Sequence, residues 1–128
     1  MDTVDLAYRS ARGVASAIRS GELKSREYLD AMLDRIARLD GPLNPVVTID
    51  ADRARREADE ADRAVRQGAR LGPLHGVCMT IKDSFMTKGM RTTSGAPELS
   101  GLVPDVDAVP VARLRTAGAP RVGLARLK

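Results

Sequence analysis

The sequence predicts an α/β protein, with helices in its first half and strands joined by a helix in its second. Apolar residues between Leu29 and Leu39 recur at intervals of three and four, which places them on one face of a helix. Residues Val77 to Ile81 instead form a short apolar run typical of a strand, and a further helical pattern follows around Val111. Helices that lead into a strand and then another helix are typical of an α/β arrangement.

The first two helices have recognisable ends. The first carries a short apolar stripe made of Ala11, Val14, Ala15 and Ile18. Gly21 is expected to end it, because glycine tolerates the left-handed geometry of a helix C-terminus. Ser25 is the predicted N-cap of the second helix, and Glu27 places a carboxylate in the first turn, where the helix dipole favours one. Its apolar face comprises Leu29, Met32, Leu33, Ile36 and Leu39. Gly41-Pro42 then breaks the pattern.

A short strand and a third helix are predicted next. Val46 to Ile49 is a β-branched run beside prolines, as in an edge strand. Asp50 is expected to cap a helix that reaches about Gln67. Its inward positions are Ala51, Ala54, Ala58, Ala61 and Val65. Six acids and six bases lie between Asp50 and Arg70, which predicts a solvated outer face rather than a binding site.

The pattern changes after Gly68. A turn precedes the Val77 to Ile81 strand, and a glycine-rich loop containing Thr92 to Gly95 follows it. Asp105 or Asp107 is expected to cap a helix that Gly118 closes. The apolar residues of that helix are Val111, Leu114 and Ala117.

Length and composition limit the class of protein. A chain of 128 residues makes one domain, which we divide into a helical part at 1–70 and the start of an α/β core at 71–128. Only 2% of the residues are aromatic, so aliphatic side chains and methionine must build the core. The single cysteine, Cys78, excludes an internal disulfide, and the longest uncharged stretch, from Leu71 to Ile81, is too short to span a bilayer. We expect a soluble cytoplasmic protein that contacts no membrane.

The positive charge does not indicate a nucleic-acid partner. The formal net charge is +4, but the last sixteen residues carry five bases and no acid, so the rest of the chain carries −1. A nucleic-acid surface would also need aromatic side chains or a basic stripe, and the sequence shows neither. We interpret the charge as that of a solvated terminus. The sequence indicates no oligomeric state.

Lys82 is the strongest candidate for chemistry. It ends the predicted strand, and the carboxyl ends of strands in open α/β sheets are where ligands bind. Strand alternation places Lys82 on the same face as Cys78 and Thr80. A lysine held among apolar neighbours loses its proton more readily and can act as a base. The alternative is a structural lysine that pairs with Asp83 at the strand edge.

Other candidate sites are weaker. His75 and Cys78 suggest a thiol hydrolase, but their spacing places them on opposite faces of the strand, which favours a buried cysteine and a turn histidine. Asp83, Asp105 and Asp107 lack the histidines or spaced carboxylates of a magnesium site. Neither the P-loop pattern nor the dinucleotide-binding glycine pattern occurs. We therefore expect no bound metal and no cofactor.

Three segments resemble the amidase signature family. The segment GPLHGVCMTIK from Gly72 to Lys82, with the Asp83-Ser84 that follows and the later TTSGA from Thr92 to Ala96, is similar to the family's lysine region. DAVPVARLRTAGA resembles the helix that leads into the family's next strand, and IRSGELKSREYLDAMLDRIARLDGPLN resembles its N-terminal helices. The resemblance implies an α/β fold in which N-terminal helices lead into the first strands of a mixed sheet covered by helices.

The resemblance also implies a reaction. Amidase signature enzymes hydrolyse carbon–nitrogen bonds of amides without metal or cofactor, using a serine nucleophile, a second serine in a cis peptide, and a lysine that corresponds to Lys82. Cys78 stands where the family usually has proline. The glycine- and serine-rich segment that bears both serines is not found, and Ser84 and Ser94 do not replace it. The sequence therefore predicts an incomplete amidase-signature fold, inactive on small amides by itself, poorly folding, and with exposed apolar surface at an unpaired sheet edge.

Three hypotheses follow in order. The chain is the N-terminal portion of an amidase, or a piece of the related kind of amidotransferase component that needs companion subunits. Alternatively it is a non-catalytic remnant that acts as a small interaction protein, with the apolar stripe from Leu29 to Leu39 as its interface. A basic nucleic-acid binder ranks last. The change in character after Ala119 suggests that the end at Lys128 reflects a truncation or a frameshift.

Overall fold

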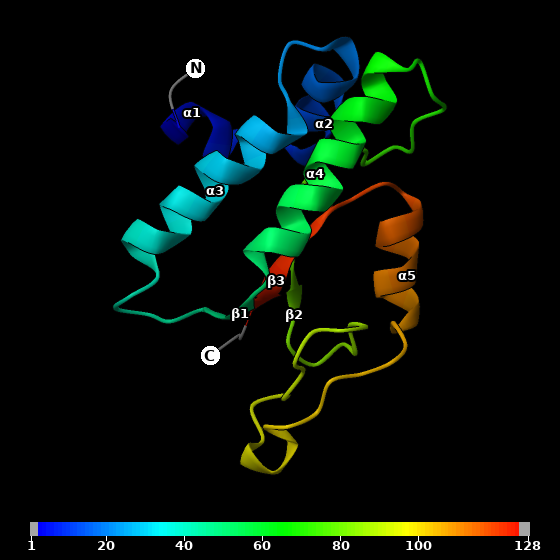
Figure 1. The fold of residues 1–128 in the computed structure, drawn as a ribbon. Helices are drawn as coiled ribbons and strands as arrows, with labels where there is room; N and C mark the ends of the chain where they lie inside the picture. The colour runs from blue at the N-terminus through cyan, green and yellow to red at the C-terminus, as the bar shows by residue number, and fades with distance from the viewer. Residues whose placement is uncertain (1–2, 126–128) are drawn as a thin grey trace.

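The computed structural model describes residues 3–125, in which helices surround a small sheet and a long loop extends away from it (Figure 1). The helices are α1 (Thr3–Tyr8), α2 (Ala11–Ser20), α3 (Ser25–Leu39), α4 (Ala51–Arg66) and α5 (Val109–Thr116). The strands are β1 (Val46–Ile49), β2 (Met79–Lys82) and β3 (Arg121–Ala125), and the 3-10 helix η1 (Pro97–Leu99) lies within the loop. The predicted α/β class is confirmed.

The strands form one mixed sheet, as predicted. Their order is β1-β3-β2, with β3 parallel to β2 and antiparallel to β1. Because parallel neighbours need a crossover connection, the chain leaves β2, passes through the long loop and α5, and returns as β3. Gly123 in β3 lies so close to the Thr48 carbonyl that a side chain there would collide with it. The central strand therefore requires glycine at this position, where it pairs with Ile49 of β1.

The predicted ends of α2 and α4 are confirmed. Ser10 caps α2 by accepting a hydrogen bond from Gly13 N–H, and Gly21 closes it with a φ of 78°. Asp50 caps α4 by accepting from Arg53 N–H at 3.0 Å, and the helix ends just before Gln67. The Gly21 and Asp50 predictions succeed because each involves residues within a few positions of one another, whereas the Ser10 cap is not among the predictions.

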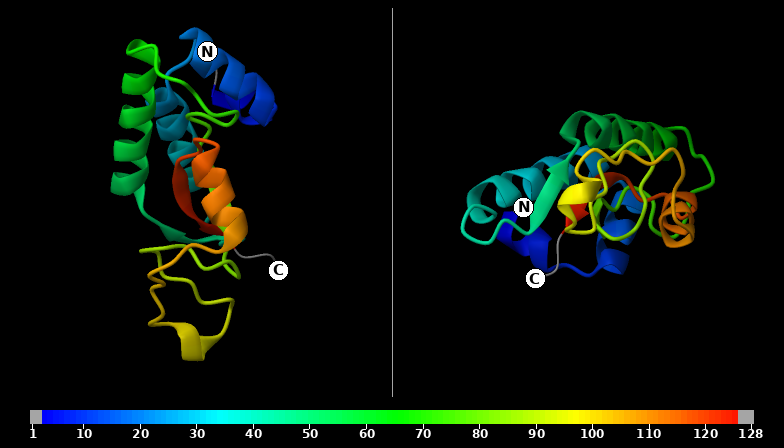
Figure 2. Two further views of the ribbon diagram at one scale, coloured as in Figure 1. Left: turned by 90° about the vertical axis from the view of Figure 1, so that its right-hand side faces the viewer. Right: turned by 90° about the horizontal axis from the view of Figure 1, so that it is seen from below.

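Small side chains allow α4 to lie close to the rest of the fold. Ala54, Ala58 and Ala61 are buried, and α4 packs against both α3 and β3. Figure 2 shows α4 on one side of the sheet, with α2 near its far end and the long loop extending in the opposite direction. The apolar stripe of α3 contributes to this core at its beginning, where Leu29 is fully buried, but Leu39 at its end is 55% exposed. The stripe is therefore partly core and partly surface.

The predicted N-cap of α3 is wrong. Ser25 is the first helical residue, and Lys24 occupies the cap position without a side-chain bond. The Ser25 hydroxyl instead donates to the Gly76 carbonyl at 2.7 Å. Asp62 of α4 performs the capping across space, because its carboxylate accepts from Ser25 N–H at 2.7 Å and from Arg26 N–H at 3.1 Å. A carboxylate from another helix thus replaces the local hydroxyl.

Two other helix and strand boundaries differ from prediction. Neither Asp105 nor Asp107 caps α5, whose cap position is Ala108 without a side-chain bond. The Asp107 carboxylate instead accepts a hydrogen bond from the backbone N–H of Lys88, in the long loop. The β2 strand begins at Met79, because the preceding Val77 still belongs to a turn in which its N–H donates to the Leu74 carbonyl.

The basic C-terminal segment is not a solvated terminus over residues 121–125. These residues form β3, the central strand, and Gly123 is buried. Pairing with β1 and β2 on both sides satisfies the backbone of this strand, which explains why it forms without a long apolar run. The predicted exposed apolar surface is present elsewhere, at side chains such as Leu43 and Ile49. Within residues 3–125, no helix is long and apolar enough to cross a membrane.

Candidate active site

Lys82 lies where the sequence places it, at the carboxyl end of β2. Its register partner is Ala125, at the carboxyl end of the parallel strand β3. The carboxyl ends of the two parallel strands therefore meet at one edge of the sheet, the edge at which α/β proteins bind ligands. Ile81 points into the core and is 5% exposed, whereas Lys82 alternates outward and is exposed. The amine is thus displayed at the strand edge.

The side chain of Asp83 binds a turn of the long loop and not its neighbour Lys82. Its side chain is only 3% exposed, and its carboxylate accepts from Thr93 N–H at 2.9 Å and from the Thr93 hydroxyl at 2.5 Å. The Asp83 carbonyl also accepts from Ser94 N–H at 3.0 Å. Among the described side chains, no ion pair joins Lys82 to Asp83, so the alternative of a paired structural lysine is wrong in that form.

The turn that binds Asp83 has an unusual backbone. Ser94 has a φ of 51° and Gly95 a φ of 73°, two left-handed residues in succession. A non-glycine residue adopts this geometry only where its surroundings hold it. Here the Asp83 bonds and a bond from Gly95 N–H to the Thr93 hydroxyl hold the turn, and Ser94 is exposed at its tip.

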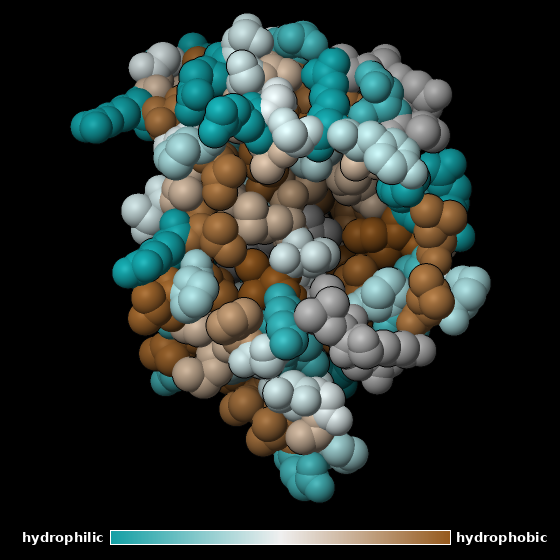
Figure 3. Space-filling view, turned by 180° about the vertical axis from the view of Figure 1, so that it is seen from behind, coloured by the Kyte–Doolittle hydropathy of each residue, from teal (hydrophilic) through white to brown (hydrophobic). Residues whose placement is uncertain are grey.

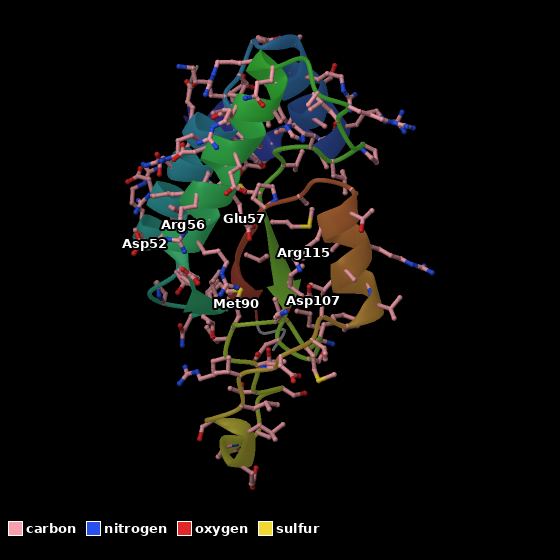
Figure 4. The ribbon with its side chains drawn as sticks, turned by 45° about the vertical axis from the view of Figure 1, so that its right-hand side comes forward. Asp52, Arg56, Glu57, Met90, Asp107 and Arg115 are labelled. Atoms are coloured by element: carbon pink, nitrogen blue, oxygen red, sulfur yellow. The ribbon has the colours of Figure 1, made fainter. Side chains whose placement is uncertain are left out.

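A second anchor fixes the loop further along. The Arg53 guanidinium of α4 donates to the Lys88 carbonyl at 3.0 Å and the Gly89 carbonyl at 3.2 Å. Asp107, just before α5, also holds the loop, because it accepts a hydrogen bond from Lys88 N–H at 2.8 Å. The same carboxylate forms an ion pair with Arg115 of α5 at 2.6 Å. Asp107 and Arg115 lie together beside α5 in Figure 4. Arg53 of α4 and Asp107, which precedes α5, thus both bind the backbone of Lys88.

The inner side of the loop packs against the α/β core. Met90 is 2% exposed and forms a cluster with Ile81 of β2 and Val111 of α5. The loop also closes on itself, because Thr92 N–H donates to the Leu102 carbonyl at 3.0 Å. The segment that follows Lys82 is therefore an ordered part of the site.

His75 and Cys78 do not form the thiol hydrolase site that was the alternative to Lys82. Cys78 is 7% exposed, and burial raises the pKa of its thiol to about 12, so the reactive thiolate is disfavoured. His75 Nε2 lies 2.9 Å from the Ala61 carbonyl oxygen, to which it donates when protonated. The interpretation of a buried cysteine and a turn histidine is confirmed. Among residues 3–125, no cluster of three or more histidine, cysteine or acidic side chains has the arrangement of a metal site.

An apolar groove lies beside the face of β2 that carries Thr80. Its volume is about 540 Å³, and it runs between α3 and the first two strands. Its lining includes Tyr28, Met32, Ile36, Leu43, Val46 and Thr80. Viewed from behind, the surface of the molecule is hollowed among apolar side chains (Figure 3). Thr80, an exposed lining residue, lies two residues before Lys82 on the same strand.

The fold is that of an α/β protein with a lysine at the carboxyl edge of its parallel strands, and comparison with known proteins gives its family. A family model described as Amidase matches residues 27–128, and the chain therefore belongs to that family. It is 41% identical over 114 residues to a glutamyl-tRNA(Gln) amidotransferase subunit of Acidothermus cellulolyticus, in a match that covers 89% of this chain and 23% of that protein.

Solved structures agree with this assignment. The peptide amidase of Stenotrophomonas maltophilia matches with a TM-score of 0.87 and 39% identity, over 94% of this chain and 25% of that one. A fatty acid amide hydrolase matches with a TM-score of 0.88 and 25% identity, over 96% of this chain and 22% of that one. The chain thus spans about a quarter of the length of its relatives.

Sequence reasoning locates Lys82 but misses the groups that organise its surroundings. The sequence presents Asp83 only as a partner of the lysine or of a metal, and Arg53 only as part of a solvated helix face. The glycine-rich pattern of Thr92 to Gly95 is the available signal for a special turn. Its contact with Asp83 spans ten residues and follows from no local pattern.

Proposed function

We propose that this chain forms the N-terminal part of an amidase catalytic domain and supplies Lys82 as its base, in the cytoplasm and on small amides. One observation carries the proposal: Lys82 lies exposed at the carboxyl edge of the parallel strands, in a chain of the amidase family. The neighbouring Asp83 carboxylate is engaged by Thr93, which leaves the amine without that partner. An amine at such an edge can exchange a proton with a bound substrate or nucleophile.

The proposed reaction needs two serines that we place outside this quarter of the domain. The Lys82 amine accepts a proton from the second serine, which takes one from the nucleophilic serine, whose oxygen then attacks the amide carbonyl. Backbone N–H groups of the serine loop stabilise the oxyanion. The carbon–nitrogen bond breaks as the proton is returned to the departing nitrogen, and water then hydrolyses the acyl-enzyme. No metal or cofactor takes part in this scheme.

The register of the sheet suggests where the serine loop begins. Because Ala125 pairs with Lys82, a chain that continues after β3 starts beside the lysine. Loops that leave the carboxyl ends of neighbouring parallel strands converge on one site. We therefore place the serine-bearing segment after β3 in the complete domain.

A chimera tests this function. In the Stenotrophomonas peptide amidase, which matches 94% of this chain, residues 3–125 would replace the corresponding quarter. We expect the folded chimera to hydrolyse peptide amides and the Lys82→Ala chimera to lose at least about 100-fold in kcat, as removal of a general base does. Lys88→Ala, at an exposed lysine of the long loop, is the matched control and should retain activity. A folded chimera without turnover, or one that keeps its activity after Lys82→Ala, contradicts the proposal.

An amidotransferase component is the second candidate, favoured by the curated relatives. Several are glutamyl-tRNA(Gln) amidotransferase subunits, 38–42% identical to this chain. In that case the same Lys82 chemistry would release ammonia to an acceptor, and activity would require companion subunits. An exchange of the same quarter into the Acidothermus protein separates the candidates: amidation that depends on Lys82 supports the amidotransferase, and amide hydrolysis in the peptide amidase chimera alone supports the amidase.

A further inference from the structure

We propose that Asp83 is a positioning residue for Lys82, which rests on the proposed function of that lysine. Asp83 follows the lysine directly, yet its carboxylate is turned into the protein and is 3% exposed. Both of its oxygens are used by Thr93, one by the N–H at 2.9 Å and the other by the hydroxyl at 2.5 Å. This arrangement keeps an adjacent negative charge from pairing with the amine.

The separation matters because a carboxylate next to a lysine normally works against a basic amine. An ion pair stabilises the protonated ammonium, which cannot accept a proton. Asp83 avoids this effect while remaining buried, because Thr93 supplies the two donors that a buried carboxylate requires. Thr93 is thus the group that decides which way the Asp83 charge faces.

The same bonds place a turn beside the lysine edge. The Asp83 carbonyl accepts from Ser94 N–H, so side chain and backbone of one residue bind two successive residues of the turn. Ser94 and Gly95 hold left-handed geometry there, and Ser94 is exposed. Asp83 therefore acts in two ways: it withholds its charge from Lys82, and it holds the turn formed by Thr93, Ser94 and Gly95.

The test is a double-mutant cycle in which the reactivity of the Lys82 amine is measured. The variants are Thr93→Val, which removes only the hydroxyl donor, Asp83→Asn, and the two combined. Each 128-residue chain is treated with the N-hydroxysuccinimide ester of acetic acid, and acetylation of Lys82 is measured against Lys88 in the same molecule by peptide mass spectrometry. Thr92→Val is the matched control, because the Thr92 hydroxyl donates to the Met90 carbonyl and does not touch Asp83.

In Thr93→Val the Asp83 oxygen that the hydroxyl bound loses its donor, while the other oxygen keeps the backbone N–H of residue 93. The unbound oxygen can then pair with Lys82, and we expect the Lys82 to Lys88 rate ratio to fall about threefold, the size of an exposed ion pair. Asp83→Asn combined with Thr93→Val should restore the ratio, because the charge is gone, and Thr92→Val should leave it unchanged. A purely structural role for Asp83 would instead alter both lysines together. Equal ratios in all variants, or a double variant as slow as Thr93→Val, overturn the proposal.

This readout is independent of hydrolysis. If the labelling pattern is as expected and the Lys82→Ala chimera keeps its activity, the proposed function fails and the role of Asp83 toward the amine stands. If the chimera depends on Lys82 but the labelling ratio does not respond to Thr93→Val, the role of Asp83 fails alone.

Discussion

Replacement of Asp62 by alanine should reveal how strongly the two central helices depend on a cap that crosses between them. Asp62 lies on α4, is 8% exposed, and accepts from Ser25 N–H at 2.7 Å and Arg26 N–H at 3.1 Å at the start of α3. The cap position of α3, Lys24, has no side-chain bond of its own. In Asp62→Ala these two N–H groups lose their acceptor at a helix N-terminus, where the dipole also favours a negative charge.

The magnitude follows from these contacts. Loss of an N-cap destabilises a protein by about 1–2 kcal/mol, and a buried donor left without a partner adds about 1 kcal/mol or more. We therefore expect the free energy of unfolding to fall by about 2–3 kcal/mol. For a chain of this length, 1 kcal/mol corresponds to roughly 4 °C, so Tm should fall by about 8–12 °C. Thermal and urea unfolding followed by circular dichroism measure both quantities.

Asp59→Ala is the matched control on the same helix. Asp59 pairs with Arg26 through the guanidinium at 2.8 Å but is half exposed, and such surface pairs contribute less than about 1 kcal/mol. Asp62→Asn keeps one carbonyl oxygen as an acceptor and should fall between the two. If Asp62→Ala lowers stability no more than Asp59→Ala, the cross-helix cap is not what holds the start of α3.

Two further predictions concern the core and the loop. Burial raises the pKa of the Cys78 thiol to about 12 from an ordinary value of 9.0, so above pH 9 the unfolded chain loses a proton that the native chain keeps. Stability should therefore fall between pH 9 and 12 by up to about 1.4 kcal/mol per pH unit more than in Cys78→Ala, measured by urea unfolding, and parallel slopes would refute this. Arg53→Lys breaks the two-pronged contact with the Lys88 and Gly89 carbonyls, and amide exchange at Gly89 should accelerate about tenfold by NMR. Arg56→Lys on the same helix, with no effect expected, is its control, and equal acceleration in both would contradict the anchor.

Residues that interact over a few positions explain why much of the fold was predictable. Gly21 ends α2 and Asp50 caps α4 as expected, because each interaction lies within one turn of its own helix. Val46 to Ile49 forms a strand with the predicted bounds. Lys82 lies at the strand end because strand length and alternation are also local properties.

The failures share a different physical origin. Ser25 has the typical composition of an N-cap, yet its hydroxyl binds Gly76, fifty-one residues away, and Asp62 takes over the cap. Asp107 precedes a helix but binds Lys88 N–H nineteen residues earlier. In each case the side chain binds a partner that is distant in sequence, and the local preference is overridden.

The sequence by itself determined the presence of helices α2 to α5 and of the first two strands, the position of Lys82 at a strand end and, through three matching segments, the family. Only the tertiary structure decided that the basic segment after Ala119 is the central strand, because a strand's place in a sheet depends on neighbours on both sides and not on its own residues. The tertiary structure likewise decided that Asp83 turns toward Thr93 and away from Lys82. Whether the Asp83 carboxylate binds Lys82 or Thr93 depends on burial and geometry, and these exist only once the chain has folded.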